Sequence, residues 1–426
     1  MKNVAFTICA TNYVGLAKVL ERSIYKHYKD LDFYIIVADE PSEVVRNSFE
    51  ENILVAKDVL DYSEQKWYEM AFKYNLTEFC TAIKPASILY LLGKGYEKCI
   101  YFDPDIFVYS SIELIYNYLD NYNAVVTPHI TEIEKDYTGN LKEDRLLFSG
   151  TFNLGFFAIN NASLSCNFLE WWSKRLEDYC FANLTESLFT DQKWVDMLPS
   201  FFSDKLLVCR NKGLNMAPWN FHERVVSEDD GVLYVANRFE ANSAKTPLVF
   251  VHYSGYNYKA LLSGEVEQKN IKKMAQYTDL GVIFDVYRTA LTEGQFSQYI
   301  DQNYTYNYYN VTEKAITARE RILFRGYVEG TGYDENPFSN ESYFYQKLKA
   351  LGFLKIAGKP QTFEDSMKEG GQQKIGKVNK VFKILFKLIG AERYYTMTRV
   401  FFKYSIWENH YFLVKKDSEE YKMRRF

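Results

Sequence analysis

Residues 101–111, YFDPDIFVYSS, place two aspartates on either side of a proline inside an otherwise apolar run. The run predicts a buried strand that begins near Cys99, and Asp103 and Asp105 fall at its carboxyl end. An unpaired carboxylate is costly to bury, so a buried pair needs a cation, hydrogen-bond donors or raised pKa values. Two interpretations are open: an Asp-Pro turn that closes the strand, and a clamp for a metal ion.

The segments on both sides of this stretch alternate between strand and helix patterns. Leu16, Val19, Leu20 and Ile24 recur at helical spacing after a first apolar strand, and residues 64–93 predict helices in two pieces split at Thr81. Strands that are apolar on both faces predict a mostly parallel sheet covered by helices on both sides. Ligands bind such sheets at the carboxyl ends of the strands, which is where the two aspartates lie.

After Thr151 the pattern becomes mixed, with a strand at 152–160, a helix at 162–180 and further strands that end within 247–257. We therefore expect an α/β fold, a Rossmann-like mixed sheet sandwiched by helices, with a mainly helical C-terminal extension. The expected parts are a main domain at 1–260, a helical tyrosine-rich extension at 261–355, a linker at 356–373 and a basic amphipathic tail at 374–426.

The composition narrows the class of protein. The chain has 426 residues, of which 47% are hydrophobic and 25% charged, and no apolar run approaches the about 20 residues that span a bilayer. Its start reads as a first strand and not as a signal peptide. Six cysteines without a Cys-x-x-Cys pair disfavour a disulfide scaffold or a structural zinc site and predict a cytoplasmic protein.

A series of short motifs resembles a known family. The motifs are TNY (11–13), TAIKP (81–85), YFDPDIFV (101–108), FNLGF (152–156), TDQKW (190–194) and VHYSG (251–255). Over residues 1–260 the chain resembles retaining glycosyltransferases of the A-type fold (GT-A), and is most similar to family 8, the glycogenin and bacterial lipopolysaccharide galactosyl- and glucosyltransferases. The resemblance implies transfer of a hexose from a UDP-sugar to a saccharide or lipid-linked saccharide, in the assembly of a bacterial surface polysaccharide.

The resemblance also implies a metal site. Asp103, Asp105 and His252 would be the ligands, and Asp103 would also contact the donor's ribose. Carboxylates suit Mg²⁺ or Mn²⁺, and an imidazole nitrogen favours Mn²⁺. A bound cation would neutralise the diphosphate as it leaves. The alternative for His252 is an ordinary hydrogen-bonded histidine at the end of a strand.

Other residues are implied as contacts to the donor, each beside a structural alternative. Tyr13 would stack on uracil or pack on its own helix, Lys84 would face the donor or solvent, and Gly155 would admit the sugar or mark a bulge. Lys259 would contact the leaving group, although it follows Gly255 by four residues where the family has three. The donor-binding set is Thr11, Asn12, Tyr13, Lys84, Asp103, Asn153, Gly155 and Gly255.

The resemblance implies that Asp191 and Gln192 are catalytic residues that lie beneath the transferred sugar. It also implies a front-face reaction that needs no protein nucleophile. The alternative for Asp191 is a helix cap. Trp219, Asn220 and His222 combine a flat ring with polar groups, which fits sugar binding or a packed loop. Ten tyrosines between residues 253 and 309 leave the same choice between an acceptor platform and helix packing.

The C-terminal tail is strongly basic. From Gln372 to the end the net charge is +8, and the remainder carries −12. Apolar residues and lysines occupy different faces of a helix at 377–390, which predicts contact with an anionic membrane at its inner face, or docking on the acidic remainder or a second subunit. Nucleic-acid binding is not expected, because basic character is confined to this tail.

Two rival functions remain. A sugar nucleotidyltransferase uses a similar sheet, but here the first strand leads into CATNYVGLAK (9–18) and not into a glycine-rich loop. A catalytically inactive carbohydrate-binding or scaffold protein is the rival from another class. The intact Asp-x-Asp, His252 and Asp191–Gln192 disfavour it.

Overall fold

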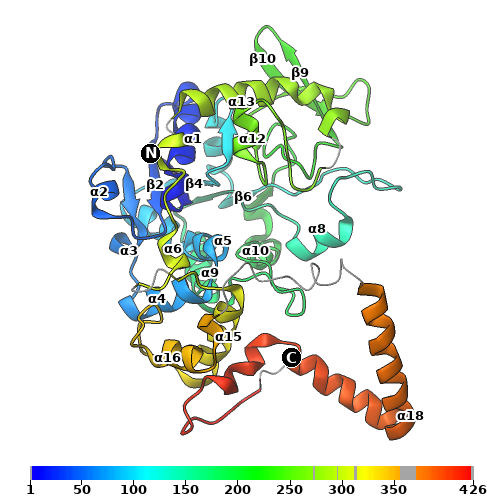
Figure 1. The fold of residues 1–426 in the computed structure, drawn as a ribbon. Helices are drawn as coiled ribbons and strands as arrows, with labels where there is room; N and C mark the ends of the chain where they lie inside the picture. Colours follow the sequence, from blue (N-terminus) through cyan, green and yellow to red (C-terminus); the bar gives the residue numbers. More distant parts are fainter. Residues whose placement is uncertain (1, 272–273, 295, 311–313, 356–370, 424–426) are drawn as a thin grey trace. The chain divides into compact units, whose positions relative to one another are not determined.

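A computed structural model describes residues 2–271, 274–294, 296–310, 314–355 and 371–423 (Figure 1). The chain forms two compact units: unit 1 comprises Met1–Tyr62 and Leu76–Thr305, and unit 2 comprises Ser63–Asn75 and Tyr306–Phe426. The domain limit expected at residue 260 does not separate these units, because residues 261–305 pack within unit 1. Most of the expected linker at 356–373 lies outside the described residues.

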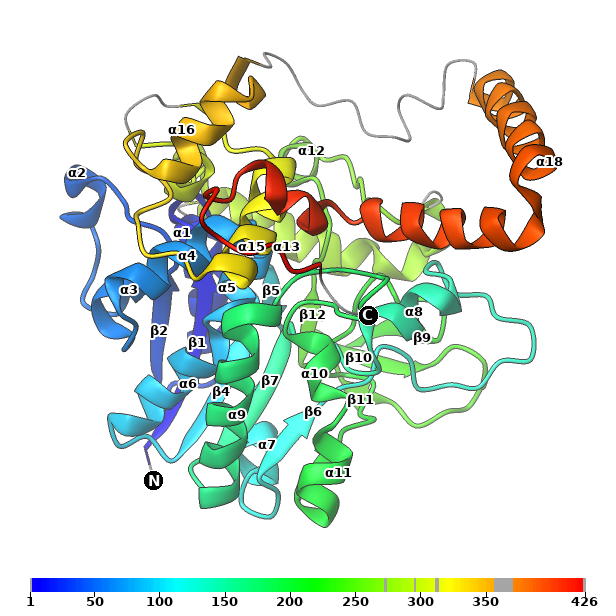
Figure 2. The same ribbon diagram turned by 90° about the horizontal axis from the view of Figure 1, so that it is seen from below.

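Unit 1 is built on a seven-stranded mixed sheet (Figure 2). All pairs are parallel except those that β7 makes with β4 and β6, so the sheet is mixed as expected. In spatial order the strands are β3 (Ile53–Val55), β2 (Asp32–Val37), β1 (Asn3–Cys9), β4 (Lys98–Phe102), β7 (Phe156–Asn160), β6 (Ala124–Val126) and β8 (Leu206–Val208).

Helices cover both faces of this sheet, which confirms the predicted α/β class. On one face Ala5 and Cys9 of β1 share a core with α1 (Val14–His27) and α7 (Glu113–Tyr118). On the other face lie α5 (Leu76–Ala82), α6 (Lys84–Gly93) and α9 (Ser163–Tyr179), and Trp172 of α9 contacts Phe157 of β7 at 5.5 Å between ring centroids. Burying this apolar surface is the main source of the sheet's stability.

Shorter elements complete unit 1. A three-stranded sheet contains β9 (Arg224–Asp229), β10 (Val232–Asn237) and β11 (Thr246–Pro247). The remaining helices are α2 (Glu43–Arg46), α3 (Ala56–Val59), α8 (Glu143–Ser149), α10 (Gln192–Val195), α11 (Leu198–Phe202), α12 (Tyr258–Leu262), α13 (Gly281–Glu293) and α14 (Phe296–Tyr299).

A two-stranded ribbon brings His252 to the Asp-Pro-Asp turn. Strand β5 (Ile106–Val108) follows that turn, and β12 (Phe250–His252) pairs with it in antiparallel register, with His252 opposite Ile106. The N–H of Tyr253 donates to the carbonyl of Asp105 at 2.8 Å. Two segments far apart in the sequence are thereby fixed at the end of β4.

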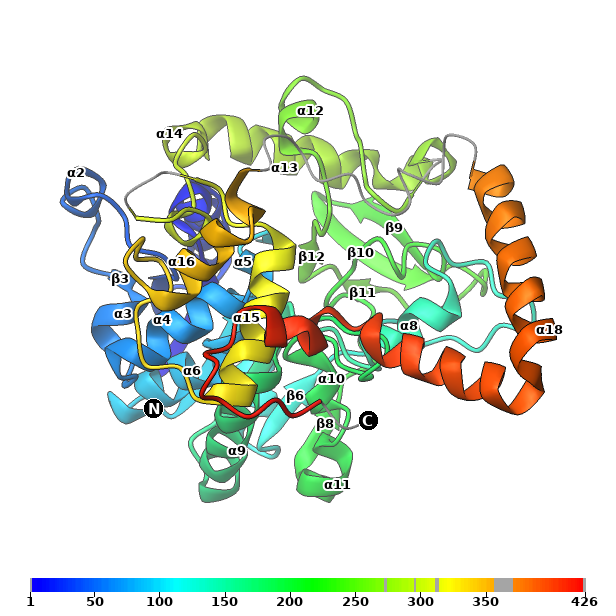
Figure 3. The same ribbon diagram turned by 60° about the horizontal axis from the view of Figure 1, so that its bottom comes forward.

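Unit 2 is helical. It contains α4 (Glu64–Lys73), α15 (Ala318–Thr331), α16 (Tyr343–Ala350) and α18 (Gly371–Tyr404), and a 3-10 helix, η7 (Trp407–Leu413), that lies against α15 (Figure 3). The two-piece helix predicted at 64–93 is wrong in detail, since α4, α5 and α6 are three helices and Pro85 lies in the first turn of the last.

Helix α18 is broken at Gly390, whose φ of 78° lies outside the helical region. Phe386 and Tyr394 meet across this break at 5.3 Å between ring centroids. Within the described residues, no helix is both long and apolar enough to cross a bilayer.

Eight of the ten tyrosines between residues 253 and 309 are buried, which favours helix packing over the acceptor platform. The ring of Tyr253 stacks on that of Tyr287 of α13, with 3.8 Å between ring centroids. The hydroxyl of Tyr109 and the hydroxyl of Tyr253 each donate to the carbonyl of Ile283.

Candidate metal and donor site

Three side chains converge at the carboxyl end of β4. One ligand atom from each of Asp103, Asp105 and His252 lies within 4.8 Å of the others. The Nε2 of His252 is 3.0 Å from Oδ1 of Asp105 and 3.6 Å from Oδ2 of Asp103. The predicted ligand set is therefore assembled around one point.

Charge and burial act against each other in this cluster. Burial raises the pKa of Asp103 and the facing Asp105 raises it further, whereas Lys84 and His252 act in the opposite direction. Burial lowers the pKa of His252, but the two aspartates raise it by more, so its pKa lies above the ordinary value. Two carboxylates held this close favour a positive partner, which is a proton on His252 or a bound cation.

The residues fit a divalent metal. Oδ1 of Asp105 is buried and accepts no hydrogen bond within the described residues, although His252 lies at ion-pair distance. The hydroxyl of Tyr101 donates to Oδ1 of Asp103 at 2.5 Å, which leaves Oδ2 turned toward His252. Two hard oxygens and one imidazole nitrogen are a donor set for Mn²⁺ or Mg²⁺.

Gly155 keeps this arrangement open. A Cβ at this position would lie 2.2 Å from Cε1 of His252 and 2.9 Å from Oδ2 of Asp103. The carbonyl of Gly155 also accepts from the N–H of Asp103 at 2.7 Å. The glycine makes room for the histidine ring, a reason that the sequence did not reveal.

A cavity of about 340 Å³ opens beside the cluster. Tyr13 lines it together with the ends of β1 and β4 and one side of α5, and its predicted contact with the donor stays a prediction. The lining residues are Ile8, Cys9, Ala10, Tyr13, Leu76, Thr77, Cys80, Thr81, Tyr101, Asp103, Pro104, Asp105, His252 and Ser254. Binding pockets for small ligands begin at about this size.

Asp39, a buried acid at the end of β2, was not predicted as a site residue. Its Oδ1 accepts from the N–H and the hydroxyl of Thr11, each at 2.8 Å, and its Oδ2 accepts from the N–H of Thr305 at 3.2 Å. Thr11 therefore holds the end of β1 and does not line the cavity. The neighbouring Asn12 has a buried Oδ1 with no hydrogen-bond partner among the described residues.

Lys84 and Asp191 form a buried ion pair at 2.5 Å. Nζ of Lys84 also donates to the carbonyl of Leu154 at 2.8 Å and lies 4.1 Å from the centre of the Tyr101 ring. Neither charged residue lines the cavity. Asp191 makes no side-chain cap to α10, so the capping alternative is wrong.

Gln192 and Asn153 lie on the far side of His252 from the aspartates. Oε1 of Gln192 accepts from the N–H of Leu154 at 3.1 Å and from Nδ2 of Asn153 at 3.4 Å. Oδ1 of Asn153 is 3.2 Å from Nδ1 of His252. Asn153 was predicted to bind the donor, and in this structure it contacts the histidine.

Two further predicted contacts lie away from the cavity. Lys259 is exposed in the first turn of α12, and Gly255, with a φ of 73°, is exposed in the turn before it. Their roles toward the donor stay predictions.

The segment 215–224 is a packed loop and not an open sugar site. Trp219, Asn220 and His222 are all buried, and the Trp219 ring stands perpendicular to His252 at 5.2 Å. Nε2 of His222 lies 3.2 Å from Oε1 of Glu134.

No protein-family model matches the chain. An uncharacterized protein of Bacillus subtilis (strain 168), YfnD, is 23% identical over 256 residues, which cover 59% of this chain and 76% of YfnD. The galactosyltransferase LgtC, solved with donor and acceptor sugar analogues, is 17% identical with a TM-score of 0.37, over 68% of this chain and 96% of LgtC. The bifunctional glycosyltransferase WbbM is 13% identical with a TM-score of 0.39, over 70% of this chain and 51% of WbbM. At these values the similarities assign neither a family nor an activity to this chain.

Proposed function

We propose that this chain is a metal-dependent, retaining glycosyltransferase of the GT-A type that transfers a hexose from a UDP-sugar to a saccharide or lipid-linked saccharide. One observation carries the proposal: ligand atoms of Asp103, Asp105 and His252 meet within 4.8 Å, beside a cavity at the carboxyl ends of β1 and β4. Open α/β sheets bind nucleotide ligands at this edge.

The protein's own residues supply the positions that the reaction needs. Asp103, Asp105 and His252 would hold Mn²⁺ or Mg²⁺, which when bound would neutralise the departing diphosphate. Tyr101 fixes Asp103 through its hydroxyl, and Tyr13 presents a ring to the cavity for the nucleoside. Ile8, Ala10 and Leu76 contribute apolar side chains to the lining of that cavity.

The surroundings of Asp191 disfavour a role for this residue as a protein nucleophile. Its carboxylate is paired with Lys84 at 2.5 Å and buried, so it is neither free nor exposed to the cavity. A front-face route, in which the acceptor attacks on the side from which the nucleotide leaves, needs no such nucleophile. We expect Asp191 and Gln192 to support the site from beneath.

We further propose that the enzyme works on bacterial surface polysaccharide at the cytoplasmic face of the membrane, with α18 as the membrane contact. Lysines and exposed apolar side chains occur together along that helix, which supports this placement.

A donor screen tests the proposal. The full chain is incubated with a panel of UDP-sugars, with Mn²⁺ or with a chelator, and release of UDP is measured. We expect release with one donor that depends on the metal. Metal binding without release from any donor would contradict the enzymatic role and favour a carbohydrate-binding protein.

A further inference from the structure

His252 is held through both nitrogens of its ring. Nε2 faces the aspartates, and Nδ1 lies 3.2 Å from the amide oxygen of Asn153 in a buried contact. An amide oxygen can only accept, so this contact requires a proton on Nδ1. Nε2 then carries a second proton toward the aspartates or, as a metal ligand, a lone pair directed at the point where Asp103 and Asp105 converge.

The amide of Asn153 is itself oriented by its neighbours. Its Oδ1 accepts from the N–H of Gly155 at 3.2 Å and from Nδ2 of Asn215 at 3.1 Å, and its Nδ2 donates to Gln192 at 3.4 Å. A flipped amide would place its own NH₂ against two donors. The oxygen is therefore kept toward His252.

Asn215, unlike Asn153 and Gln192, was not predicted as a site residue. It is 1% exposed and donates through Nδ2 to both Asn153 and the hydroxyl of Thr127, the latter at 2.8 Å. Its φ of 53° is unusual for a residue other than glycine. Such a conformation persists where the surroundings hold it, and it is often found at functional sites.

The backbone around Asn215 is fixed as well. Nδ2 of Asn220 donates to the carbonyl of Asn215 at 3.0 Å and to that of His129 at 3.2 Å. The next residue, Met216, accepts the N–H of His252 at 2.8 Å. Asn215 thus lies in the segment that pairs with β12, and its side chain reaches the same histidine from a second direction.

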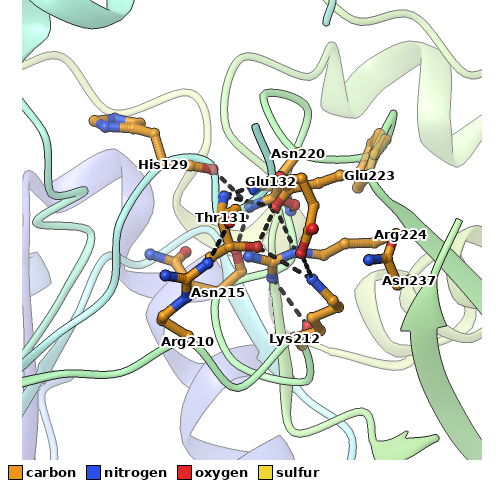
Figure 4. A network of polar contacts seen from close by, with 12 residues as sticks. His129, Thr131, Glu132, Arg210, Lys212, Asn215, Asn220, Glu223, Arg224 and Asn237 are labelled. Carbon is orange, nitrogen blue, oxygen red and sulfur yellow. Dashed lines mark hydrogen bonds and ion pairs between the residues drawn. The ribbon is translucent and has the colours of Figure 1, made fainter. Parts of the chain in front are cut away.

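The buried carboxylate of Glu223 holds the segment that carries Asn215 in place (Figure 4). Glu223 accepts from the N–H of Thr131 at 2.9 and 3.1 Å, from its hydroxyl at 2.9 Å, and from the N–H of Glu132 at 2.9 Å. Arg224 donates to the carbonyl of Leu214 at 2.8 Å. The loop that carries Asn215 is therefore tied to the segment after β6 on one side and to β12 on the other.

We propose that Asn215, acting through Asn153, is a positioning residue that holds His252 in the ring orientation and tautomer that a metal ligand requires. The inference rests on the proposed metal site and extends it to a residue that touches neither metal nor donor. Support of this kind behind a ligating histidine commonly changes metal affinity by about 10- to 100-fold.

Two substitutions distinguish the role of the Asn215 side-chain amide from the role of its backbone conformation. Asn215→Gly keeps a backbone suited to positive φ and removes the amide. Asn215→Asp keeps the size but turns a carboxylate oxygen toward Oδ1 of Asn153, where a donor is needed. Titration of the metal-free full chain with Mn²⁺ should show a loss of affinity of about tenfold or more in both variants.

Asn160→Ala is the matched control. Asn160 donates to the carbonyls of Leu119 and Tyr122, each at 3.2 Å, at the opposite end of β7 from the site. Its loss should lower thermal stability and leave the Mn²⁺ affinity unchanged. Unchanged affinity in both Asn215 variants would overturn the proposal.

A second measurement reads the tautomer directly. Nitrogen NMR of the unsubstituted protein saturated with diamagnetic Mg²⁺ should show His252 with its proton on Nδ1, whereas the Asn215 variants at the same Mg²⁺ concentration should show a fraction of His252 without bound metal. A proton on Nε2 of the Mg²⁺-saturated protein would overturn the proposal. If the unsubstituted protein binds neither Mn²⁺ nor Mg²⁺, the proposed metal site fails; if it binds them and the Asn215 variants bind equally well, the positioning role alone fails.

Discussion

The strand pairing at Asp105 uses its backbone and not its side chain. Its carboxylate contacts His252, whereas the bond that joins β5 to β12 uses its backbone carbonyl. Removing the side chain therefore takes away a ligand and leaves the strand pairing intact.

Asp105→Ala should abolish Mn²⁺-dependent release of UDP, by at least about 100-fold, with little change in thermal unfolding, because charge stabilisation at the leaving group is lost. Asp120→Ala, which removes a half-exposed partner of Lys98, is the control and should keep activity. Loss of the folded state in Asp105→Ala would support the alternative of a purely structural turn.

Gly155→Ala tests the close approach of His252. The added Cβ overlaps the histidine ring, so the ring or β7 must move, and we expect a loss of about 1–3 kcal/mol in the free energy of unfolding together with weaker Mn²⁺ binding. Gly93→Ala, in α6 with open space around the new Cβ, should do neither. Normal Mn²⁺ affinity in Gly155→Ala would show that the ring has room to shift.

His129 predicts a pH dependence of stability. Burial lowers its pKa to about 4, against hydrogen bonds to the backbone of Thr151 and Gly150 that act to raise it. The folded protein keeps this histidine neutral, whereas the unfolded chain protonates it near pH 6.5. Between these values the unfolded state binds more protons, so stability is present above about pH 6.5 and is lost as the pH falls toward 4.

The loss attributable to His129 should approach about 3 kcal/mol by pH 4. Urea unfolding of the full chain and of His129→Asn between pH 7 and pH 4 measures it, because the difference between the two curves removes the titration of other groups. The variant should show the shallower decline. Parallel curves would mean that the histidine is protonated in the folded state.

At the scale of elements, periodicity predicted which segments are strands, and position at a strand end predicted Asp103 and Asp105. The same rule, applied to β2, would have found Asp39 too, because this acid lies two residues beyond the end of the strand at Val37. Neither rule fixes the direction of β7, because direction depends on how the chain returns to the sheet. The Lys84–Asp191 pair and the role of Asn215 depend on contacts between distant segments, and no local pattern signals them.

Helix α15 offers a test of how η7 docks within unit 2. A Cβ on Gly326 would lie 2.1 Å from the carbonyl oxygen of Glu408 in η7. Gly326→Ala should therefore displace η7 and lower thermal stability, with a cost of about 1–3 kcal/mol. Gly376→Ala in α18, where the new Cβ meets nothing within 4 Å, should be neutral or slightly stabilising. Equal stability of both variants would mean that η7 is loosely held.

At the scale of the whole molecule, positive charge and exposed apolar surface are both concentrated on α18. The segment 375–389 carries four lysines and no acidic residue, and the chain outside the tail is acidic. Eleven large apolar side chains of α18 are exposed: Ile375, Val378, Val381, Ile384, Phe386, Leu388, Tyr395, Val400, Phe401, Phe402 and Tyr404. Exposed apolar surface of this extent marks an interaction site, and the lysines favour an anionic one.

Deleting the tail would be a poor test of membrane contact, because η7 packs on α15 and its removal would uncover that helix. Reversing the charge of three lysines, in Lys380→Glu/Lys383→Glu/Lys387→Glu, leaves η7 in place. Each lysine near an anionic surface contributes about 1 kcal/mol, so binding to phosphatidylglycerol vesicles should fall by at least about 100-fold.

The control variant is Lys29→Glu/Lys205→Glu/Lys245→Glu, which makes the same change of net charge at exposed positions of unit 1 and should bind normally. Co-sedimentation with vesicles measures both, with neutral phosphatidylcholine vesicles alongside. If the α18 variant binds as well as the unsubstituted chain, the exposed face of this helix has a partner other than lipid.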